Sequence, residues 1–331
     1  MRGEGKAAPR IGVVIVTYNS ARVLGPCLES LRAQQPAVAL TIIVVDNGSA
    51  DGTQELARTR FPEVVLIEAP RNGGFSYGTN IGLRAVGLLD GPPAGASTLP
   101  PCDYVLFLNA DTELPAGALA QLVALLASRP EIGAVSPRLV RLDGTLDQAC
   151  RRGSPTAWNA LCHLLGLDRR WPQSARFGHY NLTYLPENQA AAVDSVAGAF
   201  MLMPAEAVRQ VGAWDEEYFA YGEDIDYCLR VRQAGWLVWY EPSVTVLHLK
   251  GAISQQRSLR MIGEFYRAMR IYYRKHQAER HPAPVRLLIT GGIYLFQALA
   301  LLRQRLRAPG ARWVGAARPV PDAAPPRPGH G

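Results

Sequence analysis

The chain has 331 residues, of which 48% are hydrophobic and 19% are charged, and this composition excludes an intrinsically disordered protein. The net charge of +7 is concentrated near the C-terminus: residues 257–312 include twelve basic and two acidic side chains, which leaves a net charge of −3 on the remainder. A nucleic-acid-binding core is therefore not expected, whereas the basic segment is suited to an anionic surface.

Apolar runs alternate with helical patterns through the first half of the chain. Strands are predicted over Ile11–Val16, Thr41–Val45 and Val64–Glu68, with a helix after each of the first two and another over Ser76–Leu89. The first run is too short to be the apolar part of a signal peptide, and five cysteines without a CxxC pair are typical of a reducing compartment. These features predict βαβ units with a mainly parallel sheet, in a cytosolic protein.

The segment Tyr104–Leu108 is apolar at every position, which is typical of a strand buried on both faces. It ends at Asn109-Ala110-Asp111, where a carboxylate could meet a hard cation that carries phosphate oxygens. Asp111 could equally cap the next helix, because Pro115 is suited to a first helical turn. From these residues alone both interpretations stay open.

Polar loops rich in Asn, Asp and Gly follow the predicted strands. They are Thr17–Ser20, Asp46–Thr53, Asn72–Phe75 and Asn109–Asp111. The carboxyl ends of parallel strands meet at one edge of a sheet, so we expect these loops to converge there, where Asp46 could accept hydrogen bonds from a base or ribose. Gly73-Gly74 could let the backbone approach a ligand or could form a plain tight turn. Neither a GxGxxG nor a P-loop motif is present, so a cation on Asp111 is the expected holder of a diphosphate.

The second half of the chain follows a Pro- and Gly-rich loop at Asp90–Pro101 and the strand at Tyr104. Helices are predicted over Pro115–Ser128, Ala205–Val211 and from Glu223 to Gly235, and strands over Gly133–Val140, Val196–Met203, Trp236–Tyr240 and Val244–Leu249. Residues 150–192 have only a weak pattern, which is typical of a segment that shapes a substrate site.

Two further groups are candidates for chemistry. Glu223 and Asp224 stand at a predicted helix start, where the helix dipole stabilises negative charge. They could be simple capping residues, or they could include a carboxylate that takes a proton from an attacking hydroxyl. His248 ends a predicted strand; a lone histidine is more often structural, but with Asp111 available it becomes a candidate metal ligand.

Two helices are predicted in the tail, over Gln255–His276 and Val285–Leu302. The second is mostly apolar but is interrupted by polar residues, and it falls short of the ~20 apolar residues that span a membrane. We expect it to lie in the membrane interface, the alternative being a core helix of the domain or of a homo-oligomer. Residues 308–331 are rich in Pro, Gly and Arg and are expected to be disordered.

Six motifs follow one another along the chain. They are TYNS, VVDNGSADGT, NGGFSYGTNIGL, FLNADTEL, the run from GAFMLM to RQAGW, and VLHLKG. From about Ile11 to His276 this set resembles the family 2 inverting glycosyltransferases, and most of all their bacterial rhamnosyltransferase-like branch. The resemblance implies an α/β protein with a GT-A fold: a doubly wound, mainly parallel central sheet with flanking helices, plus a C-terminal helical extension.

The resemblance also implies roles for individual residues. The donor site would be formed by strand-end residues, namely Thr17, Tyr18, Asn19, Asp46, Asn47, Asn72, Gly73, Asn109, Ala110 and Asp111, with Asn80 nearby. Asp111 and His248 would hold Mg²⁺ or Mn²⁺, and Asp224, next to Glu223, would be the general base. Many members have two aspartates at the metal motif, and Asn109 replaces the first here, which should weaken binding of a free cation.

The expected protein is an inverting hexosyltransferase that moves rhamnose or a related hexose from a nucleoside-diphosphate sugar to a hydroxyl of a glycan or lipid-linked acceptor. Its glycosyltransferase domain is expected over 1–250, with a nucleotide-binding half over 11–113 and an acceptor half over 114–250, followed by basic helices in 251–307. The expected partner of 255–307 is an anionic membrane, on the inner face of the cell membrane, and no nucleic acid is expected to bind.

Two other classes of function are open to test. A sugar nucleotidyltransferase would need a Gly-rich basic loop after the first strand, which TYNSARVL lacks. A non-catalytic glycan- or nucleotide-binding scaffold would be indicated if Asp111 or Asp224 were missing, and both are present.

Overall fold

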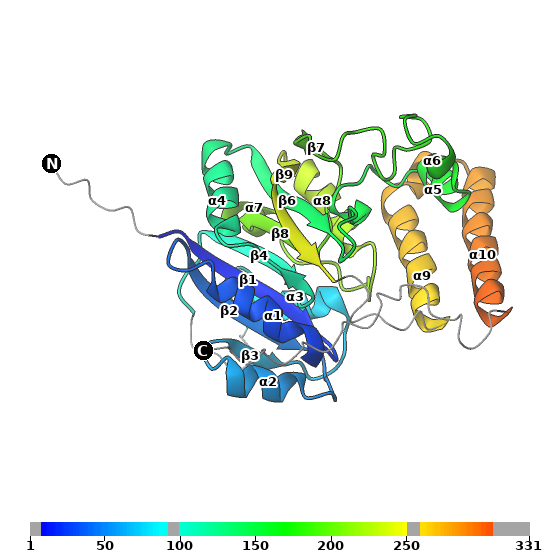
Figure 1. Ribbon diagram of the computed structural model, residues 1–331. Helices are drawn as coiled ribbons and strands as arrows, with labels where there is room; N and C mark the ends of the chain where they lie inside the picture. The colour runs from blue at the N-terminus through cyan, green and yellow to red at the C-terminus, as the bar shows by residue number, and fades with distance from the viewer. Residues whose placement is uncertain (1–7, 92–98, 250–258, 307–331) are drawn as a thin grey trace, which may run out of the picture.

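The computed structural model describes residues 8–91, 99–249 and 259–306. Within them the chain forms one nine-stranded sheet with helices packed around it, and a pair of long helices stands at one side of the molecule (Figure 1). The predicted tail 308–331, most of the predicted loop Asp90–Pro101 and the start of the predicted helix Gln255–His276 lie outside the described residues.

The strands are paired in the order β3-β2-β1-β4-β8-β6-β9-β5, and β7 pairs with β9. Their bounds are β1 Arg10–Thr17, β2 Ala39–Asp46, β3 Val65–Glu68, β4 Tyr104–Asn109, β5 Thr112–Glu113, β6 Ile132–Val140, β7 Ala191–Ala192, β8 Phe200–Pro204 and β9 Leu237–His248. Strands β3, β2, β1 and β4 are parallel, as predicted. Beyond β4 the sheet is mixed: β8 is antiparallel to β4 and β6, β5 and β7 are antiparallel to β9, and β6 and β9 are parallel.

Helices connect most of these strands. They are α1 Ala21–Arg32, α2 Thr53–Arg60, α3 Phe75–Ala85, α4 Ala118–Ser128, α5 Ala157–Leu164, α6 Leu167–Arg170, α7 Ala205–Val211, α8 Glu223–Gln233, α9 Leu259–His276 and α10 Ala283–Leu306. Helix α4 begins three residues after Pro115, because the left-handed Gly117 comes directly before it. Pro115 is therefore not in its first turn, and Asp111 does not cap this helix. Helices α5 and α6 lie in the segment 150–192, where the sequence had only a weak pattern.

One prediction about the strands was wrong. The two strands predicted over Trp236–Tyr240 and Val244–Leu249 are a single strand, β9. Its pairing with β6 shifts in the middle, since Pro137 is opposite Glu241 but the next residue, Arg138, is opposite Thr245. Residues 242–244 form a bulge in the ladder, so the proline at position 242 is accommodated without ending the strand.

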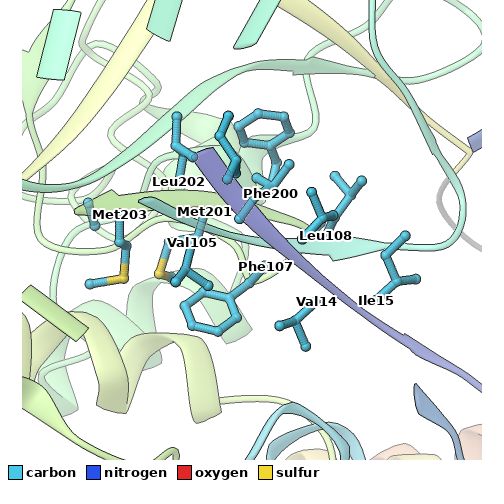
Figure 2. Close-up of a cluster of buried hydrophobic side chains, with 14 of the residues drawn as sticks. Val14, Ile15, Val105, Phe107, Leu108, Phe200, Met201, Leu202 and Met203 are labelled. Atoms are coloured by element: carbon cyan, nitrogen blue, oxygen red, sulfur yellow. The ribbon is translucent and has the colours of Figure 1, made fainter. Parts of the chain in front are cut away.

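The apolar core surrounds the central strands β1, β4 and β8 (Figure 2). Every side chain from Val105 to Leu108 is fully buried, because β4 has a strand on each side and is covered on both faces. This explains the uninterrupted apolar run. The ring of Phe107 meets that of Trp214 edge-on at 5.0 Å, and Trp214 stacks on Tyr227 of α8 at 4.3 Å. These rings attach the sheet to the helix that carries the acidic pair.

The C-terminal helices α9 and α10 pack against each other, and α9 also packs on the domain. Ile271 and Tyr272 of α9 form a small buried cluster with Tyr218 and Ile225, on either side of the α8 N-terminus. Helix α10 is longer than predicted, with 24 residues. By length and composition it could cross a membrane, and 6% of its most apolar window is buried. The described contacts therefore do not support the alternative of a core helix within the domain.

Candidate active site

The predicted convergence of polar loops at one sheet edge is confirmed. In the parallel register Thr17 is opposite Asp46, and Val16 is opposite Asn109, so β1, β2 and β4 end at the same level. The loops after them lie along one edge. Tyr18 keeps 47% of its surface exposed at this edge, directly after β1.

The carboxylate of Asp46 accepts several hydrogen bonds that organise the loop after β2. One carboxylate oxygen accepts hydrogen bonds from the backbone N–H groups of Gly48 (3.1 Å) and Ser49 (2.8 Å) and from the amide of Gln54 (2.7 Å). The other accepts from the hydroxyls of Thr17 (3.0 Å) and Ser49. Burial raises the pKa of Asp46, but these hydrogen bonds outweigh it and lower the pKa below its usual value. The carboxylate thus gives the loop its shape and Thr17 its orientation.

Asn19 joins the loop after β1 to the loop after β2. Its side-chain oxygen accepts from the N–H of Ala50 at 2.9 Å, and its own N–H donates to the Ser49 hydroxyl at 2.7 Å. Its φ of 52° is in the left-handed region, which Asn tolerates better than most residues. Tyr18 is therefore held in a rigid turn between two ordered loops.

The two predicted amides Asn47 and Asn72 shape the turn before α3. The side-chain N–H of Asn47 donates to the carbonyl of Gly74 at 3.0 Å, and the side-chain oxygen of Asn72 accepts from the N–H of Gly74 at 3.2 Å. The buried side-chain oxygen of Asn47 has no hydrogen-bond partner among the described residues. It is an acceptor at the sheet edge that a ligand could satisfy.

The glycine pair in this turn meets protein, not open space. A Cβ added to Gly74 would lie 2.1 Å from the carbonyl oxygen of Phe219, and one added to Gly73 would lie 2.4 Å from Tyr77. The N–H of Phe75 donates to the same Phe219 carbonyl at 3.1 Å. The glycines therefore let the start of α3 touch the loop before α8.

The hydrogen bonds of Asn80 connect it to the loop before α8, not to the strand-end loops. It is buried in α3, and its amide N–H donates to the Trp214 carbonyl and the Glu216 carboxylate, both at 2.9 Å. Its oxygen accepts from the Trp214 N–H at 2.8 Å. Asn80 therefore ties α3 to the loop before α8, across 134 residues of sequence.

The candidate metal ligands Asp111 and His248 are brought together by strand pairing, because Thr112 of β5 is opposite His248 of β9. The Nε2 atom of His248 lies 3.4 Å from Oδ1 of Asp111, which is long for a hydrogen bond. Oδ1 of Asp111 is buried and has no hydrogen-bond partner in the described part of the chain. Such an orphaned carboxylate oxygen fits a cation ligand.

A second carboxylate, which the sequence did not single out, stands behind His248. Oδ2 of the fully buried Asp147 lies 2.9 Å from Nδ1 of His248. Burial disfavours the charged imidazole, but its interactions with Asp111 and Asp147 outweigh burial and raise the pKa of His248 to about 9. The two carboxylates thus stabilise positive charge on the imidazole, which must release a proton before it can bind a cation. Among the described residues, no group of three or more His, Cys, Asp or Glu side chains could hold a metal ion.

The acidic pair stands in the first turn of α8, where the helix dipole stabilises negative charge. The Asp224 carboxylate is 3.3 Å from Nη1 of Arg152 and accepts from the N–H of Gly198 at 3.4 Å. Burial and the negative charge of Asp224 raise the pKa of Glu223 to about 8. One buried oxygen of Glu223 has no hydrogen-bond partner within the described residues. Glu223 therefore holds a proton more tightly than an ordinary glutamate does.

Two adjacent residues connect the acidic pair with the metal motif. Gly198 donates its N–H to Asp224, and Ala199 accepts at its carbonyl from the N–H of Asn109 at 3.0 Å. Asn109 of the metal motif and Asp224 of the acidic pair thus both bind to the two-residue segment before β8, which brings them close together. Arg152 comes to this point because its backbone forms a bridge with Ser195. The weak pattern of segment 150–192 gave no sign of this arginine.

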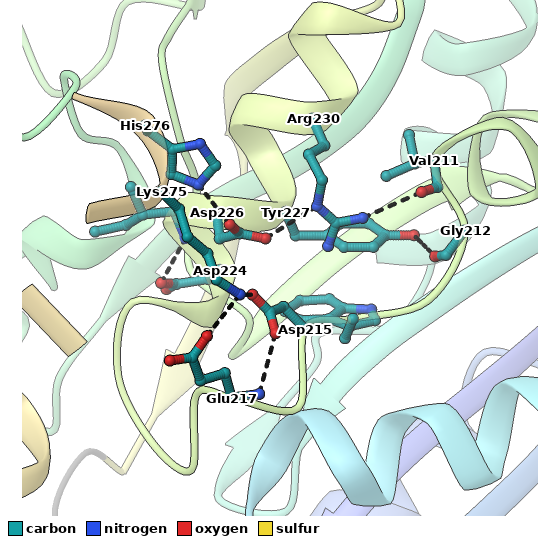
Figure 3. Close-up of polar contacts among 12 residues, drawn as sticks. Val211, Gly212, Asp215, Glu217, Asp224, Asp226, Tyr227, Arg230, Lys275 and His276 are labelled. Carbon is teal, nitrogen blue, oxygen red and sulfur yellow. Dashed lines mark hydrogen bonds and ion pairs between the residues drawn. The ribbon is translucent and has the colours of Figure 1, made fainter. Parts of the chain in front are cut away.

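Helix α9 clamps the loop before α8 (Figure 3). Lys275 pairs with Asp215 and, at 2.9 Å, with Glu217, and Nε2 of His276 lies 2.7 Å from the Asp226 carboxylate. Asp226 also accepts from Nε of Arg230 at 2.9 Å. The basic residues at the end of α9, which the sequence assigned to an anionic surface, are in part used within the protein.

The chain is similar to known glycosyltransferases. A family model described as glycosyltransferase like family 2 matches residues 9–300. The N-acetylglucosaminyl-diphospho-decaprenol L-rhamnosyltransferase of Mycobacterium tuberculosis is 29% identical over 301 residues, which cover 89% of this chain and 94% of that protein. Because the family model covers well over half of the sequence, its match decides the family.

Solved structures share the fold. The mannosyltransferase PcManGT from Pyrobaculum calidifontis, in complex with GDP-Man and Mn²⁺, has a TM-score of 0.51 at 20% identity and covers 92% of this chain and 77% of its own. TarS of S. aureus, residues 1–349, has a TM-score of 0.51 at 14% identity and covers 89% and 73%. These likenesses confirm the predicted GT-A fold. Together with the family match they show that the chain belongs to glycosyltransferase family 2.

Proposed function

We propose that this glycosyltransferase moves rhamnose or a related hexose from a nucleoside-diphosphate sugar to a hydroxyl of a lipid-linked glycan acceptor, with inversion at the anomeric carbon. The observation that carries the proposal is the link through Gly198 and Ala199, which holds Asp224 beside the metal motif. A base and a diphosphate-binding carboxylate must lie on either side of the sugar for a direct displacement. The M. tuberculosis relative, by its name, transfers L-rhamnose to a decaprenol-linked acceptor.

The donor would lie along the strand-end edge. Tyr18 offers an exposed ring to the base, and the unpaired side-chain oxygen of Asn47 offers a buried acceptor. The Asp46 carboxylate and the side-chain oxygen of Asn19 are occupied by hydrogen bonds within the loops, so in this proposal they keep the site in shape. This preorganisation reduces the ordering cost of binding. The exposed Asn72 would complete the donor-binding surface, and the buried Thr17, Gly73 and Ala110 would support it from behind.

The diphosphate would be bound with a divalent cation, Mg²⁺ or Mn²⁺, on Asp111 and His248. When bound, such a cation neutralises the charge that develops on the departing nucleoside diphosphate. The orphaned oxygen of Asp111 supports this role. Asp147 would orient His248 through Nδ1, as carboxylates behind metal-binding histidines do. Asn109 supplies no charge, so the donor's phosphates would provide further ligands.

The acceptor hydroxyl would lose its proton to Asp224 as its oxygen attacks the anomeric carbon. The bond from that carbon to the diphosphate oxygen breaks in the same displacement, and the nucleoside diphosphate leaves. Arg152, whose Nη1 lies 3.3 Å from the Asp224 carboxylate, would hold this carboxylate in position for the proton transfer. Glu223, whose pKa is raised, is suited to hold a proton beside it.

The acceptor's lipid would bring the enzyme to the cytosolic face of the cell membrane, with α10 in contact with the bilayer. Leu287 and Leu288 are 75% and 77% exposed, and Leu295 is 59% exposed, on a helix with a mean hydropathy of 1.8 over its most apolar window. Such a surface on a single molecule indicates a partner. Domain 1–250 would then hold the catalytic machinery and residues 251–307 the attachment.

A donor screen tests the proposal. Nucleotide sugars, dTDP-rhamnose first, are added with Mn²⁺ and the melting temperature is measured, because a ligand at about 100 times its Kd stabilises the native state by ~2.7 kcal/mol. The best donor is then given a lipid-linked N-acetylglucosamine acceptor. We expect release of nucleoside diphosphate and an inverted glycosidic bond. Release of pyrophosphate from a sugar phosphate and a nucleoside triphosphate would identify a nucleotidyltransferase instead.

Asp224→Asn tests the base. Loss of a general base lowers kcat by about 10²–10⁴-fold, while the donor should still raise the melting temperature. Glu206→Gln, at an exposed side chain of α7, is the matched control for loss of one carboxylate. Wild-type turnover in Asp224→Asn would rule out this residue as the base.

A further inference from the structure

We infer that helices α5 and α6 carry a second membrane-binding surface, separate from α10, which docks on a bilayer with anionic headgroups. This surface, the aromatic patch, consists of Trp158, Leu161, Leu165, Trp171 and Phe177. The inference rests on the proposed function, because a lipid-linked acceptor brings the enzyme to a bilayer.

The aromatic patch exposes large apolar side chains at helical spacing. Trp158, Leu161 and Leu165 follow one another at intervals of three and four residues, so they share one face of α5, and they are 42%, 37% and 55% exposed. Trp171, after α6, is 47% exposed. The ring of Phe177 lies between the two tryptophans, 6.1 Å from Trp158 and 5.2 Å from Trp171. These contacts make the patch continuous.

Arginines surround the patch. Arg169, Arg170 and Arg176 are exposed, and the guanidinium groups of Arg176 and Arg170 lie 5.3 Å and 5.5 Å from the rings of Trp158 and Trp171. The single acidic residue between positions 157 and 180 is Asp168, which is buried against His163 at 2.7 Å. The patch is thus apolar at its centre, and the exposed charges that its own segment places around it are those of arginines.

This combination fits the headgroup region of a bilayer. Tryptophan is enriched at that level because its ring is apolar with one polar N–H, and arginine places its charge among phosphates while its stem stays in apolar surroundings. The N–H of Trp158 is already satisfied by the Arg176 carbonyl at 3.0 Å, so burying this ring costs no hydrogen bond to water. Charge complementarity selects an anionic bilayer over a neutral one.

The patch lies at the same end of the molecule as the apolar helix α10 (Figure 1). The side chain of Gln277, between α9 and α10, donates to the carbonyl of Pro155, just before α5, at 2.7 Å. The same segment carries Arg152 against Asp224. Contact of the patch with the bilayer would therefore hold the acidic pair close to the surface from which a lipid-linked hydroxyl must approach.

Single labelled cysteines test this surface in the full chain. All five native cysteines are buried, so an added surface cysteine can be labelled selectively with an environment-sensitive dye such as NBD. Leu165→Cys reports on the patch and Leu288→Cys on α10, and Glu55→Cys on the distant helix α2 is the control. Each is mixed with vesicles of phosphatidylglycerol and phosphatidylcholine in equal parts. We expect the dyes at 165 and 288 to brighten and shift to the blue, and the dye at 55 to stay unchanged.

Three results would overturn the inference in different ways. A response at 288 with none at 165 would refute the patch but leave the membrane part of the proposed function intact, whereas silence at both positions would refute both. A response at 165 that needs no vesicles and grows with protein concentration would show that a second copy of the chain covers the patch.

The arginine rim gives an independent measurement. Removing three arginines at an anionic surface should lower vesicle partitioning by about 100-fold, so Arg169→Gln/Arg170→Gln/Arg176→Gln is compared with wild type on the same vesicles. Arg22→Gln/Arg58→Gln/Arg60→Gln changes the net charge equally on an exposed surface away from the patch. Equal losses in the two triple variants would show that only overall charge matters, and would overturn the role of the patch.

Discussion

Asp147 holds His248 in place: its carboxylate lies 2.9 Å from Nδ1 of the imidazole, and the opposite nitrogen, Nε2, then faces Asp111. Asp147 is itself fixed, because it accepts from the N–H of Ala149 and donates its own N–H to the Leu139 carbonyl. The orientation of the candidate metal ligand therefore depends on a residue in the loop after β6, 101 positions away in sequence.

Asp147→Asn should weaken cation binding about 10–100-fold, because it removes the charge behind the histidine while keeping an acceptor of the same shape. The dissociation constant for Mn²⁺ is measured by titration in the presence of a nucleoside diphosphate. Asp143→Asn, in the exposed turn nearby, is the matched control and should bind Mn²⁺ like wild type. An unchanged Mn²⁺ affinity in Asp147→Asn would refute the orienting role.

Glu223 should make the protein less stable as pH rises. Its pKa is raised from 4.5 to about 8 by burial and by the charge of Asp224. The folded state holds this proton more tightly than the unfolded chain, so the resulting stability is fully present below the unfolded pKa and is lost as pH rises through the folded pKa. We expect the free energy of unfolding to fall between about pH 5 and about pH 8, and to fall less in Glu223→Gln. Urea unfolding across this range measures it, with Glu206→Gln as control; parallel curves for wild type and Glu223→Gln would contradict the assignment.

Much of the sheet and its functional edge could be predicted from local pattern. The run Tyr104–Leu108 is apolar because β4 is central, and the polar residues after it must then lie at a strand end. Because parallel strands end at the same edge of the sheet, the strand ends also predict which loops meet there. The wrong division of β9 has a local cause as well, since Pro242 and Ser243 are typical of a turn but here form a bulge.

The contacts that complete the site could not be predicted, because they join distant segments. Asn80 is in a motif that resembles a donor site, yet its partners are in the loop before α8. Arg152 and Asp147 come from stretches without periodicity, and only the folded sheet places them beside Asp224 and His248. The spacing of residues along one chain gives no information on such long-range pairs. Correlated substitutions in related sequences would be needed to reveal them.

His276 should support catalysis without touching substrate. It lies 2.7 Å from Asp226, two residues after the proposed base, and its loss would loosen the start of α8. Because small displacements of reacting groups can cost about 100-fold, we expect His276→Ala to lower kcat by up to that factor while the donor still raises the melting temperature. His276→Gln, which keeps a donor, should recover part of the loss. Arg267→Gln, which removes an exposed pair within α9, is the control, and a wild-type kcat in His276→Ala would refute the coupling.

Gly74 allows the turn before α3 to pack directly against the loop before α8. Both Gly74 (φ 89°) and Gly48 (φ 84°) have left-handed backbones, but a Cβ at Gly74 would meet the Phe219 carbonyl at 2.1 Å, whereas a Cβ at Gly48 would meet nothing within 4 Å. Gly48→Ala should therefore cost only the backbone strain, ~1–2 kcal/mol. Gly74→Ala should cost more and should also lower donor affinity and kcat, because the loop before α8 must move away from α3. Chemical unfolding and turnover measure both effects. Equal losses of stability in the two variants would show that contact with Phe219 is not what requires a glycine at position 74.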